Sequence, residues 1–292
     1  MTIDYSRIIN AQSDGYDIQV YQQIKAEKGF VKKQLPYNTL SGMYVHTWKT
    51  NAEMEAEYFT DDRLLNKISN EASKAIPTIW KSITNLVDVF TPIACIDGNE
   101  FSCQHAAVEY PNSWIVMAPL TDDPVVTVRN MYHEMIHWKF TALGFGKGCT
   151  PEVFDMLETT DEFVLNPVSE LHHSIVNSYP DTAQPAVGNK PTGRPISASL
   201  HAYGSFLGEA EVAMKFVQYN PQKYYYWLGY AQRWGNRLDE SLEAILKGTK
   251  ATAKGAQLLL GLYRWTKEYQ EEYNVSMQVC QVVTAISSVY FN

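Results

Sequence analysis

The sequence predicts an α+β fold that is predominantly helical, within a single domain spanning residues 1–292. Apolar residues make up 45% of the chain and charged residues 19%, the balance of a globular protein with a sizeable core. Most of the sequence carries apolar residues at helical spacing. The exception is a β-prone stretch near residues 91–120, which leads directly into a well-capped helix. We divide the domain into a helical part (1–90), a core (91–217) and a helical C-terminal part (218–292).

The first ninety residues are expected to be mostly helical, because residues 52–90 place apolar side chains near helical spacing. The composition then changes in "TPIACIDGNEFSCQHAAVEYPNSWIVMAPL", where short β-prone runs are broken at Asp97-Gly98 and Pro111-Asn112. These dipeptides are typical of tight turns. The stretch therefore predicts a few short strands.

A helix of about twenty residues is predicted for "TDDPVVTVRNMYHEMIHWKFTALGFG". Asp123 is a good N-cap residue, Pro124 suits the first helical turn, and Gly144 suits the end of a helix. After it, Phe145–Arg194 is punctuated by glycine and proline and is too long for an ordinary connection, which indicates a functional loop or lid.

A second strong helix is predicted for "RPISASLHAYGSFLGEAEVAMKFV", with Pro195 in its first turn. The remainder of the chain, from Asn220 onward, predicts two or three further helices rich in tyrosine and tryptophan.

Charge and composition exclude several classes of protein. The net charge of −8 argues against nucleic-acid binding, because no basic stripe is present to neutralise phosphates. The sequence has no run of eighteen apolar residues and no recognisable signal peptide, so we expect no membrane span and a cytoplasmic location. The four cysteines are scattered, which favours free thiols over a disulfide framework, and a Cys95–Cys103 bridge across the expected hairpin is the less favoured alternative.

The strongest chemical signal is the HExxH motif formed by His133, Glu134 and His137. Residues four apart on a helix differ by about 40° in azimuth and about 6 Å in rise, so both imidazoles leave the same face. They can converge on one metal ion, and Glu134 can orient or deprotonate a bound water. A β-prone segment followed by such a helix predicts a zincin-like core, with a small sheet packed on the HExxH helix.

The third metal ligand is expected on the second helix, and His201 is the first choice. Ser197, Ser205 and Gly208 share its face, and such small residues would leave room for a metal and a substrate. Glu209 is the alternative ligand, although an ion-paired or solvated helix charge is the simpler interpretation of this residue. Three other side chains are weaker candidates: Glu211, more simply an ion-paired or solvated helix charge, and the adjacent His172 and His173, of which at most one could join the site.

Two sequence blocks in this order resemble a known family. "EYPNSWIVMAPLTDDPVVTVRNMYHEMIHWKFTALG" and "GRPISASLHAYGSFLGEAEV" are similar to the HExxH-containing iron and 2-oxoglutarate-dependent peptide β-hydroxylases. These enzymes occur with ribosomally made, post-translationally modified peptides, and so with natural product biosynthesis. The resemblance covers roughly residues 102–217.

The resemblance implies a dioxygenase that hydroxylates a C–H bond, at the β carbon, of a peptide or amino-acid substrate. Its cofactors would be Fe(II), held by His133, His137 and a third ligand, and 2-oxoglutarate. Arg194 is the expected anchor for the distal carboxylate of 2-oxoglutarate, with Arg129 as the alternative. In such an enzyme Glu134 need not act as a base.

Two other functions remain open at this point. The first is a zinc-dependent metallopeptidase or related hydrolase, with His133, His137 and Glu209 as ligands, Glu134 as general base and Tyr203 as oxyanion stabiliser. The second is a helical binding module in which the HExxH motif is inert.

Overall fold

The computed structural model describes residues 2–27, 39–40, 43–45, 62–93, 104–106, 113–143, 163–164, 194–249 and 251–290. Five helices form most of its N-terminal and central parts: η1 (Tyr5–Arg7), α1 (Tyr16–Glu27), α3 (Asp62–Ala75), α4 (Pro77–Leu86) and α5 (Pro124–Ala142). The later helices are α7 (Ile196–Tyr219), α8 (Pro221–Tyr224), η4 (Tyr225–Trp227), α9 (Leu228–Gly248) and α10 (Ala253–Tyr290). The strands are β1 (Thr39–Leu40), β2 (Met43–Val45), β3 (Val89–Ile93), β4 (Gln104–Ala106), β5 (Ile115–Pro119), β6 (Phe163–Val164) and β7 (Arg194–Pro195).

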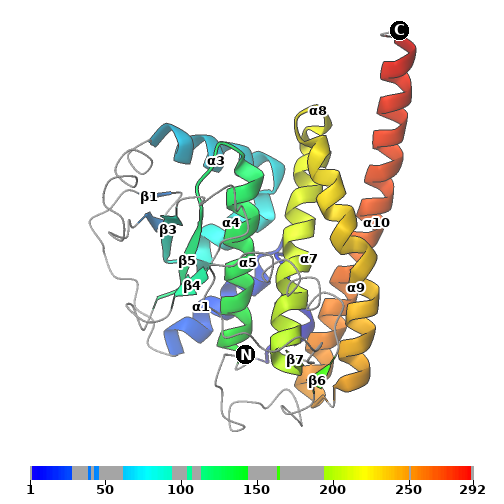
Figure 1. Ribbon diagram of the computed structural model, residues 1–292. Helices are drawn as coiled ribbons and strands as arrows, with labels where there is room; N and C mark the ends of the chain where they lie inside the picture. Colours follow the sequence, from blue (N-terminus) through cyan, green and yellow to red (C-terminus); the bar gives the residue numbers. More distant parts are fainter. Residues whose placement is uncertain are drawn as a thin grey trace, which may run out of the picture.

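A mixed five-stranded sheet has the order β1-β2-β3-β5-β4 (Figure 1). The central pairs β2–β3 and β3–β5 are parallel, whereas β1 and β4 run antiparallel to their neighbours. β6 and β7 form a separate antiparallel pair. β3 and β5 match the predicted β-prone stretch, and their residues are almost all buried, as expected for parallel strands covered on both faces.

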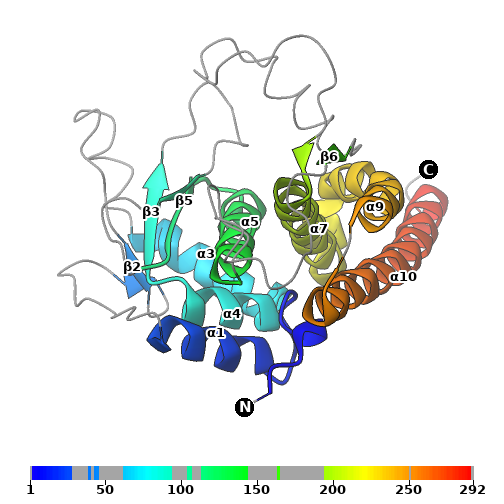
Figure 2. The same ribbon diagram turned by 90° about the horizontal axis from the view of Figure 1, so that it is seen from below.

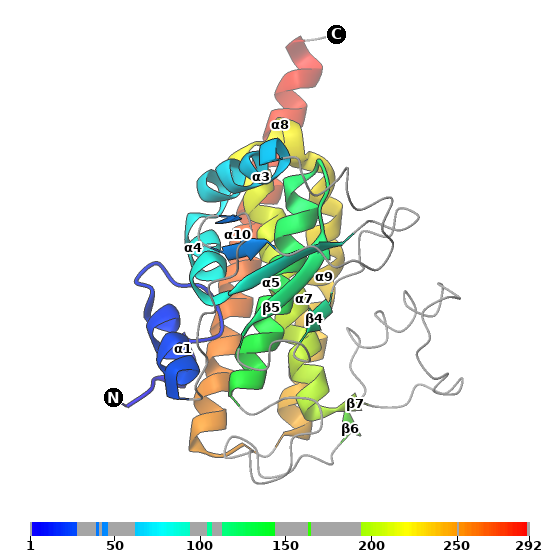
Figure 3. The same ribbon diagram turned by 90° about the vertical axis from the view of Figure 1, so that its left-hand side faces the viewer.

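Helix α5 packs directly on this sheet. It begins at Pro124, and the side chain of Asp123 caps it by accepting a hydrogen bond from Val125 N. The indole of Trp138 donates to the carbonyl of Ile115 in β5 at 2.8 Å, and its ring stacks on that of Trp114 with centroids 6.0 Å apart. These contacts fix the orientation of α5 relative to the sheet (Figure 3).

On its other side, α5 packs against a layer of long helices. α7 lies beside α5, and α9 and α10 follow beyond it, so that α5 is enclosed between the sheet and the helical layer (Figure 2). Residues 124–136 are buried without interruption. Any polar side chain on that part of α5 must therefore find a partner within the protein.

The coarse fold class is confirmed: the chain is α+β and predominantly helical, with a small sheet on the HExxH helix. The zincin-like core stays a prediction. Two details differ. β1 and β2 lie in a region expected to be helical, and α7 begins at Ile196, one residue after Pro195, which ends β7. Gly144, the cysteines Cys95, Cys103 and Cys149, and nearly all of the segment 145–193 lie outside the described residues. Within the described part of the chain, no helix is long and apolar enough to span a membrane.

Candidate metal centre

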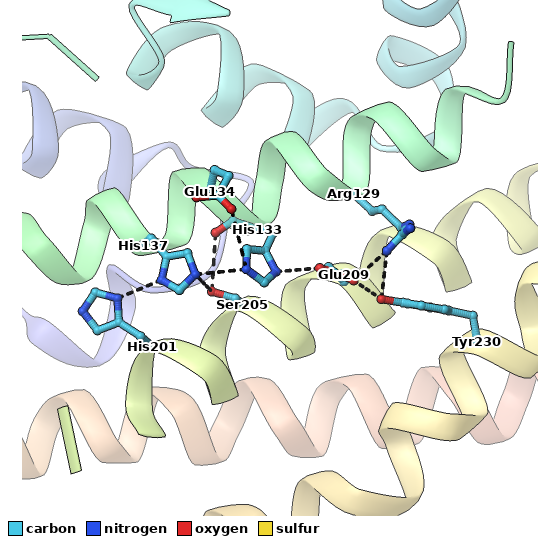
Figure 4. Close-up of polar contacts among 8 residues, drawn as sticks. All are labelled: Arg129, His133, Glu134, His137, His201, Ser205, Glu209 and Tyr230. Atoms are coloured by element: carbon cyan, nitrogen blue, oxygen red, sulfur yellow. Dashed lines mark hydrogen bonds and ion pairs between the residues drawn. The ribbon is translucent and has the colours of Figure 1, made fainter. Parts of the chain in front are cut away.

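The two histidines of the motif point toward one another from one face of α5 (Figure 4). The Nε2 atoms of His133 and His137 are 3.0 Å apart, and the ring centroids are 4.7 Å apart. Two ligands at right angles on an ion, each about 2.1 Å away, would be separated by about 3.0 Å. The pair therefore fits the coordination of a single metal ion through Nε2.

Glu134 lies beside this pair and is buried. Its Oε1 is 3.8 Å from His133 Nε2, and one ligand atom from each of Glu134, His133 and His137 falls within 4.8 Å of the others. Among the described residues, this is the one group of three or more histidine, cysteine, aspartate or glutamate side chains that could hold a metal.

His201 lies next to the motif, but on the far edge of the His137 ring. The Nδ1 atoms of His201 and His137 are 2.8 Å apart, and the two rings stack with centroids 5.1 Å apart. Phe140 packs against the His201 ring at 5.1 Å. An ion bound between the two Nδ1 atoms would lie on the edge of the His137 ring that faces away from His133 Nε2. In this arrangement His201 is a neighbour of His137 that does not share an ion with both motif histidines.

Ser205 is the side chain of α7 closest to the Nε2 pair. Its Oγ lies 3.4 Å from His137 Nε2 and donates to the carbonyl oxygen of His133 at 3.4 Å. The sequence pattern predicts Ser205 only as a small residue on the His201 face, not as a contact of the motif. The signal for its contact is its spacing, four residues after His201 and four before Glu209.

Glu209 contacts His133 through the opposite edge of that imidazole. Its Oε1 lies 2.5 Å from His133 Nδ1, and its Oε2 accepts hydrogen bonds from Arg129 Nη1 at 2.9 Å and from the Tyr230 hydroxyl. Arg129 Nη1 also donates to the Tyr230 oxygen at 3.0 Å. Both carboxylate oxygens of Glu209 are thus engaged away from His133 Nε2 (Figure 4).

Neighbouring charges favour the ionised form of the buried Glu209 and the protonated form of His133. Burial alone would raise the pKa of Glu209, but the adjacent Arg129 and His133 outweigh it, and the pKa is lowered. For His133, burial would lower the pKa, yet the charge and hydrogen bond of Glu209 and the charge of Glu134 raise it. Without a metal, the pair is held by mutual attraction in a low-dielectric interior.

The small residues on this face of α7 serve helix packing. A methyl carbon at Gly208 would lie 2.4 Å from Ile136 Cδ1 and 2.9 Å from the Tyr132 ring, and one at Gly204 would lie 2.7 Å from Phe140. The space expected there for a metal and substrate is filled by side chains of α5. The close approach of the two helices is what brings Ser205 and Glu209 to the histidines.

Several predicted residues lie elsewhere. Tyr203 is fully buried, and its hydroxyl contacts Thr266 of α10. Glu211 accepts a hydrogen bond from the Trp265 indole at 2.9 Å. Arg194 belongs by its backbone to β7, immediately before α7, but its side chain lies outside the described residues, as do His172 and His173.

Comparisons with known proteins add no family to this geometry. The chain matches no protein-family model, and a search of curated proteins finds no match either.

Proposed function

We propose that the chain is an Fe(II)- and 2-oxoglutarate-dependent oxygenase that hydroxylates a C–H bond, at the β carbon, of a peptide or amino-acid substrate. His133 and His137 would hold the metal through Nε2, with Glu134 as the carboxylate ligand. One observation carries the proposal. Both oxygens of Glu209 are bound by Arg129, Tyr230 and His133 Nδ1, whereas Glu134 is the carboxylate that falls with His133 and His137 in one group that could hold a metal.

Two imidazoles and one carboxylate are the donor set typical of non-haem iron oxygenases, because they leave open positions on an octahedral ion. The bound iron and 2-oxo acid would supply the oxidising power for breaking a C–H bond. If Glu134 is a ligand, it is no longer free to deprotonate water. Coordination of the metal by Glu134 therefore disfavours a hydrolase, which needs Glu134 as a base.

Enclosure of the site supports oxidation chemistry. The Phe206 ring meets the edge of His133 at 5.5 Å and stacks on Trp234 with centroids 3.9 Å apart. Phe140 packs beside His201. Apolar walls of this kind restrict water, which an oxygenase benefits from.

The anchor for the 2-oxo acid is proposed to be Arg194. Arg129 is fully buried, and its charge is matched by Glu209, so an anion there would compete with an existing ion pair. Arg194 stands seven residues before His201 in the chain and directly precedes α7. A guanidinium in that position can form paired hydrogen bonds with a carboxylate.

A peptide substrate is supported by the sheet. β4 is the last strand in the order of the described sheet, and it contacts α5. An edge strand can pair through its backbone with an extended peptide, which would then run alongside the helix that carries the motif.

A zinc hydrolase is the second candidate, favoured by one distance. Glu134 Oε1 is 3.8 Å from His133 Nε2, longer than the roughly 3.0 Å expected between neighbouring ligands on one ion. The extra space suits a carboxylate that acts on a metal-bound water. As the oxygenase ligand, Glu134 must move closer by about 0.8 Å, a shift within reach of a side-chain rotation.

The two functions separate in an anaerobic titration of metal-free protein, first with Fe(II) and then with 2-oxoglutarate, followed by visible absorbance. The oxygenase predicts one tightly bound iron and a new charge-transfer band after 2-oxoglutarate is added. His133→Ala and His137→Ala should abolish both signals. Tightly held zinc and no band in the wild-type protein would contradict the oxygenase.

Glu134→Gln sharpens the test. For an oxygenase with Glu134 as ligand, we expect metal affinity to fall about 10-fold or more, because an amide oxygen is the weaker ligand. For a zinc hydrolase we expect zinc affinity to be kept while peptide hydrolysis is lost. Glu211→Gln is the matched control, since it makes the same substitution at a carboxylate that accepts a hydrogen bond from the Trp265 indole, and it should retain the metal.

A further inference from the structure

The structure places a charged network behind His133, on the side away from the Nε2 pair. It consists of Arg129 on α5, Glu209 on α7 and Tyr230 on α9, and we call it the Glu209 network. We propose that the Glu209 network is a positioning device: it holds His133 in the tautomer with a proton on Nδ1, which leaves the lone pair of Nε2 facing His137.

Arg129 is placed where its charge requires a partner inside the protein. It lies four residues before His133, on the same face of α5, and its side chain is fully buried. Guanidinium stays charged in proteins, and a buried charge must be paired. Its partner is Glu209 Oε2 at 2.9 Å, and the faces of Trp227 and Tyr230 enclose it at 5.1 and 4.8 Å.

The other oxygen of Glu209, Oε1, contacts His133 Nδ1. A permanent positive charge at Oε2 keeps the carboxylate ionised, and an ionised carboxylate only accepts hydrogen bonds. The contact of 2.5 Å between Oε1 and His133 Nδ1 therefore requires a proton on Nδ1. In a neutral imidazole, the proton on Nδ1 leaves Nε2 as the atom that can bind a metal.

Tyr230 contacts both members of the Arg129–Glu209 ion pair. Its hydroxyl donates to Glu209 Oε2 and accepts from Arg129 Nη1, so the carboxylate cannot rotate without breaking its bonds to Tyr230, Arg129 and His133. This ties α9 to the histidine, although α9 carries none of the motif residues. The family resemblance implied a different role for Arg129, as an alternative anchor for the co-substrate.

The direct test is the tautomer of His133 in metal-free protein, measured by long-range ¹H–¹⁵N NMR of histidine rings near pH 8. We expect an Nδ1–H signal for His133 in the wild type. Glu209→Gln should weaken this preference, because a neutral amide can present either its oxygen or its NH₂ group to Nδ1. An Nε2–H tautomer in the wild type would overturn the proposal.

The second test is metal affinity, measured by competition with a chelator using Fe(II) or Zn(II) alone. Glu209→Gln should bind the metal about 10- to 100-fold more weakly than the wild type, the range typical for loss of an outer partner of a ligand histidine. Glu211→Gln is the matched control, because it removes the same charge two residues away, where the partner is Trp265. Equal affinity of these two variants would contradict the proposal.

A purely structural role is separated by the double variant Arg129→Met/Glu209→Gln. It removes both buried charges and should regain much of the thermal stability lost by either single change. Its metal affinity should stay low, because Nδ1 still lacks an ionised acceptor. The affinity test rests on the proposed metal site, whereas the tautomer test does not. A wild type that binds no metal but shows the Nδ1–H tautomer would refute the metal site and retain the network.

Discussion

Glu209 and Glu211 lie two residues apart on α7, the first buried and the second half-buried, yet their electrostatic states are opposite. Glu209 faces α5, where Arg129 and His133 lower its pKa despite burial. Glu211 faces α10, and burial raises its pKa to about 7, because Lys215 and the Trp265 indole only partly compensate. Burial is common to both, so the presence of a buried cation decides the charge.

The two carboxylates should therefore affect stability in opposite pH ranges. Glu209 has a lowered pKa, so its contribution is present above the unfolded value near 4.5 and is lost as pH falls through the folded pKa. Glu211 has a raised pKa, so its contribution is present below about 4.5 and is lost as pH rises toward 7. Helix α7 thus carries one carboxylate, Glu209, whose charge stabilises the folded protein and another, Glu211, whose charge destabilises it.

The largest effect is expected when Glu209 loses its cation. Arg129→Met keeps much of the side-chain volume but leaves Glu209 in the interior with His133 and the Tyr230 hydroxyl, without the guanidinium. We expect the free energy of unfolding to fall by about 3–5 kcal/mol, the cost of breaking a buried ion pair. The pKa of Glu209 should rise toward the raised pKa of Glu211. Urea unfolding at pH 7.5 measures the loss.

Lys267→Met is the control for this change, because Lys267 pairs with Asp239 at 3.1 Å in an exposed position. Loss of that pair should cost at most about 1 kcal/mol. If the lysine variant lost as much stability as Arg129→Met, burial of the Arg129–Glu209 pair would not explain the loss.

The next effect tests how Glu209 reaches His133. Gly208→Ala places a methyl carbon 2.4 Å from Ile136 Cδ1, so α7 must move away from α5. We expect a loss of about 1–3 kcal/mol from overpacking, together with weaker metal binding. The Glu211 side of the helix should change less. Differential scanning calorimetry and the chelator competition measure the two effects.

Gly229→Ala in α9 is the matched control, since nothing lies within 4 Å of the added carbon. There the helix propensity of alanine should stabilise the protein by up to about 1 kcal/mol. Destabilisation by both substitutions would show that the effect does not arise from the contact between α5 and α7.

A comparable effect is expected at Glu211, but with a pH dependence. The shift from 4.5 to about 7 corresponds to at most roughly 3 kcal/mol, and partial exposure of the side chain reduces this to about 1–3 kcal/mol. Glu211→Gln should remove this part of the decline in stability between pH 5 and 7.5 and stabilise the metal-free protein at pH 7.5. Unfolding curves at several pH values would reveal it. Parallel pH profiles for variant and wild type would mean that Glu211 titrates normally.

The sequence predicted the parts of the site that depend on spacing along one helix. The Asp123 cap, the helix through the motif and the shared face of His133 and His137 all follow from local pattern. His201 and Glu209 are the two sequence candidates for the third ligand, and both contact the motif histidines, each through Nδ1.

What the pattern could not supply is the rotation and distance of α7 relative to α5. A carboxylate near an imidazole can meet either edge of the ring, and a shift of a few ångströms decides which. Glu209 meets Nδ1, and Gly208 serves close packing where open space was expected. The partner Tyr230 lies on α9, and nothing local in its sequence marks a contact with a residue of α5 or α7.

The smallest effect is expected from Tyr230→Phe, which removes one hydroxyl from the Glu209 network and leaves Arg129 in place. Because the ion pair persists, we expect a loss of about 1 kcal/mol in stability and a few-fold loss of metal affinity. Tyr226→Phe is the matched control: its hydroxyl also contacts a carboxylate, Asp123 Oδ2 at 2.6 Å, but at an exposed position where the change should be within about 0.5 kcal/mol. If Tyr230→Phe matched this control in both stability and affinity, Arg129 alone would suffice to hold Glu209 against His133. Tyr230 would then be only a packing residue, and the link between α9 and the metal centre would be lost.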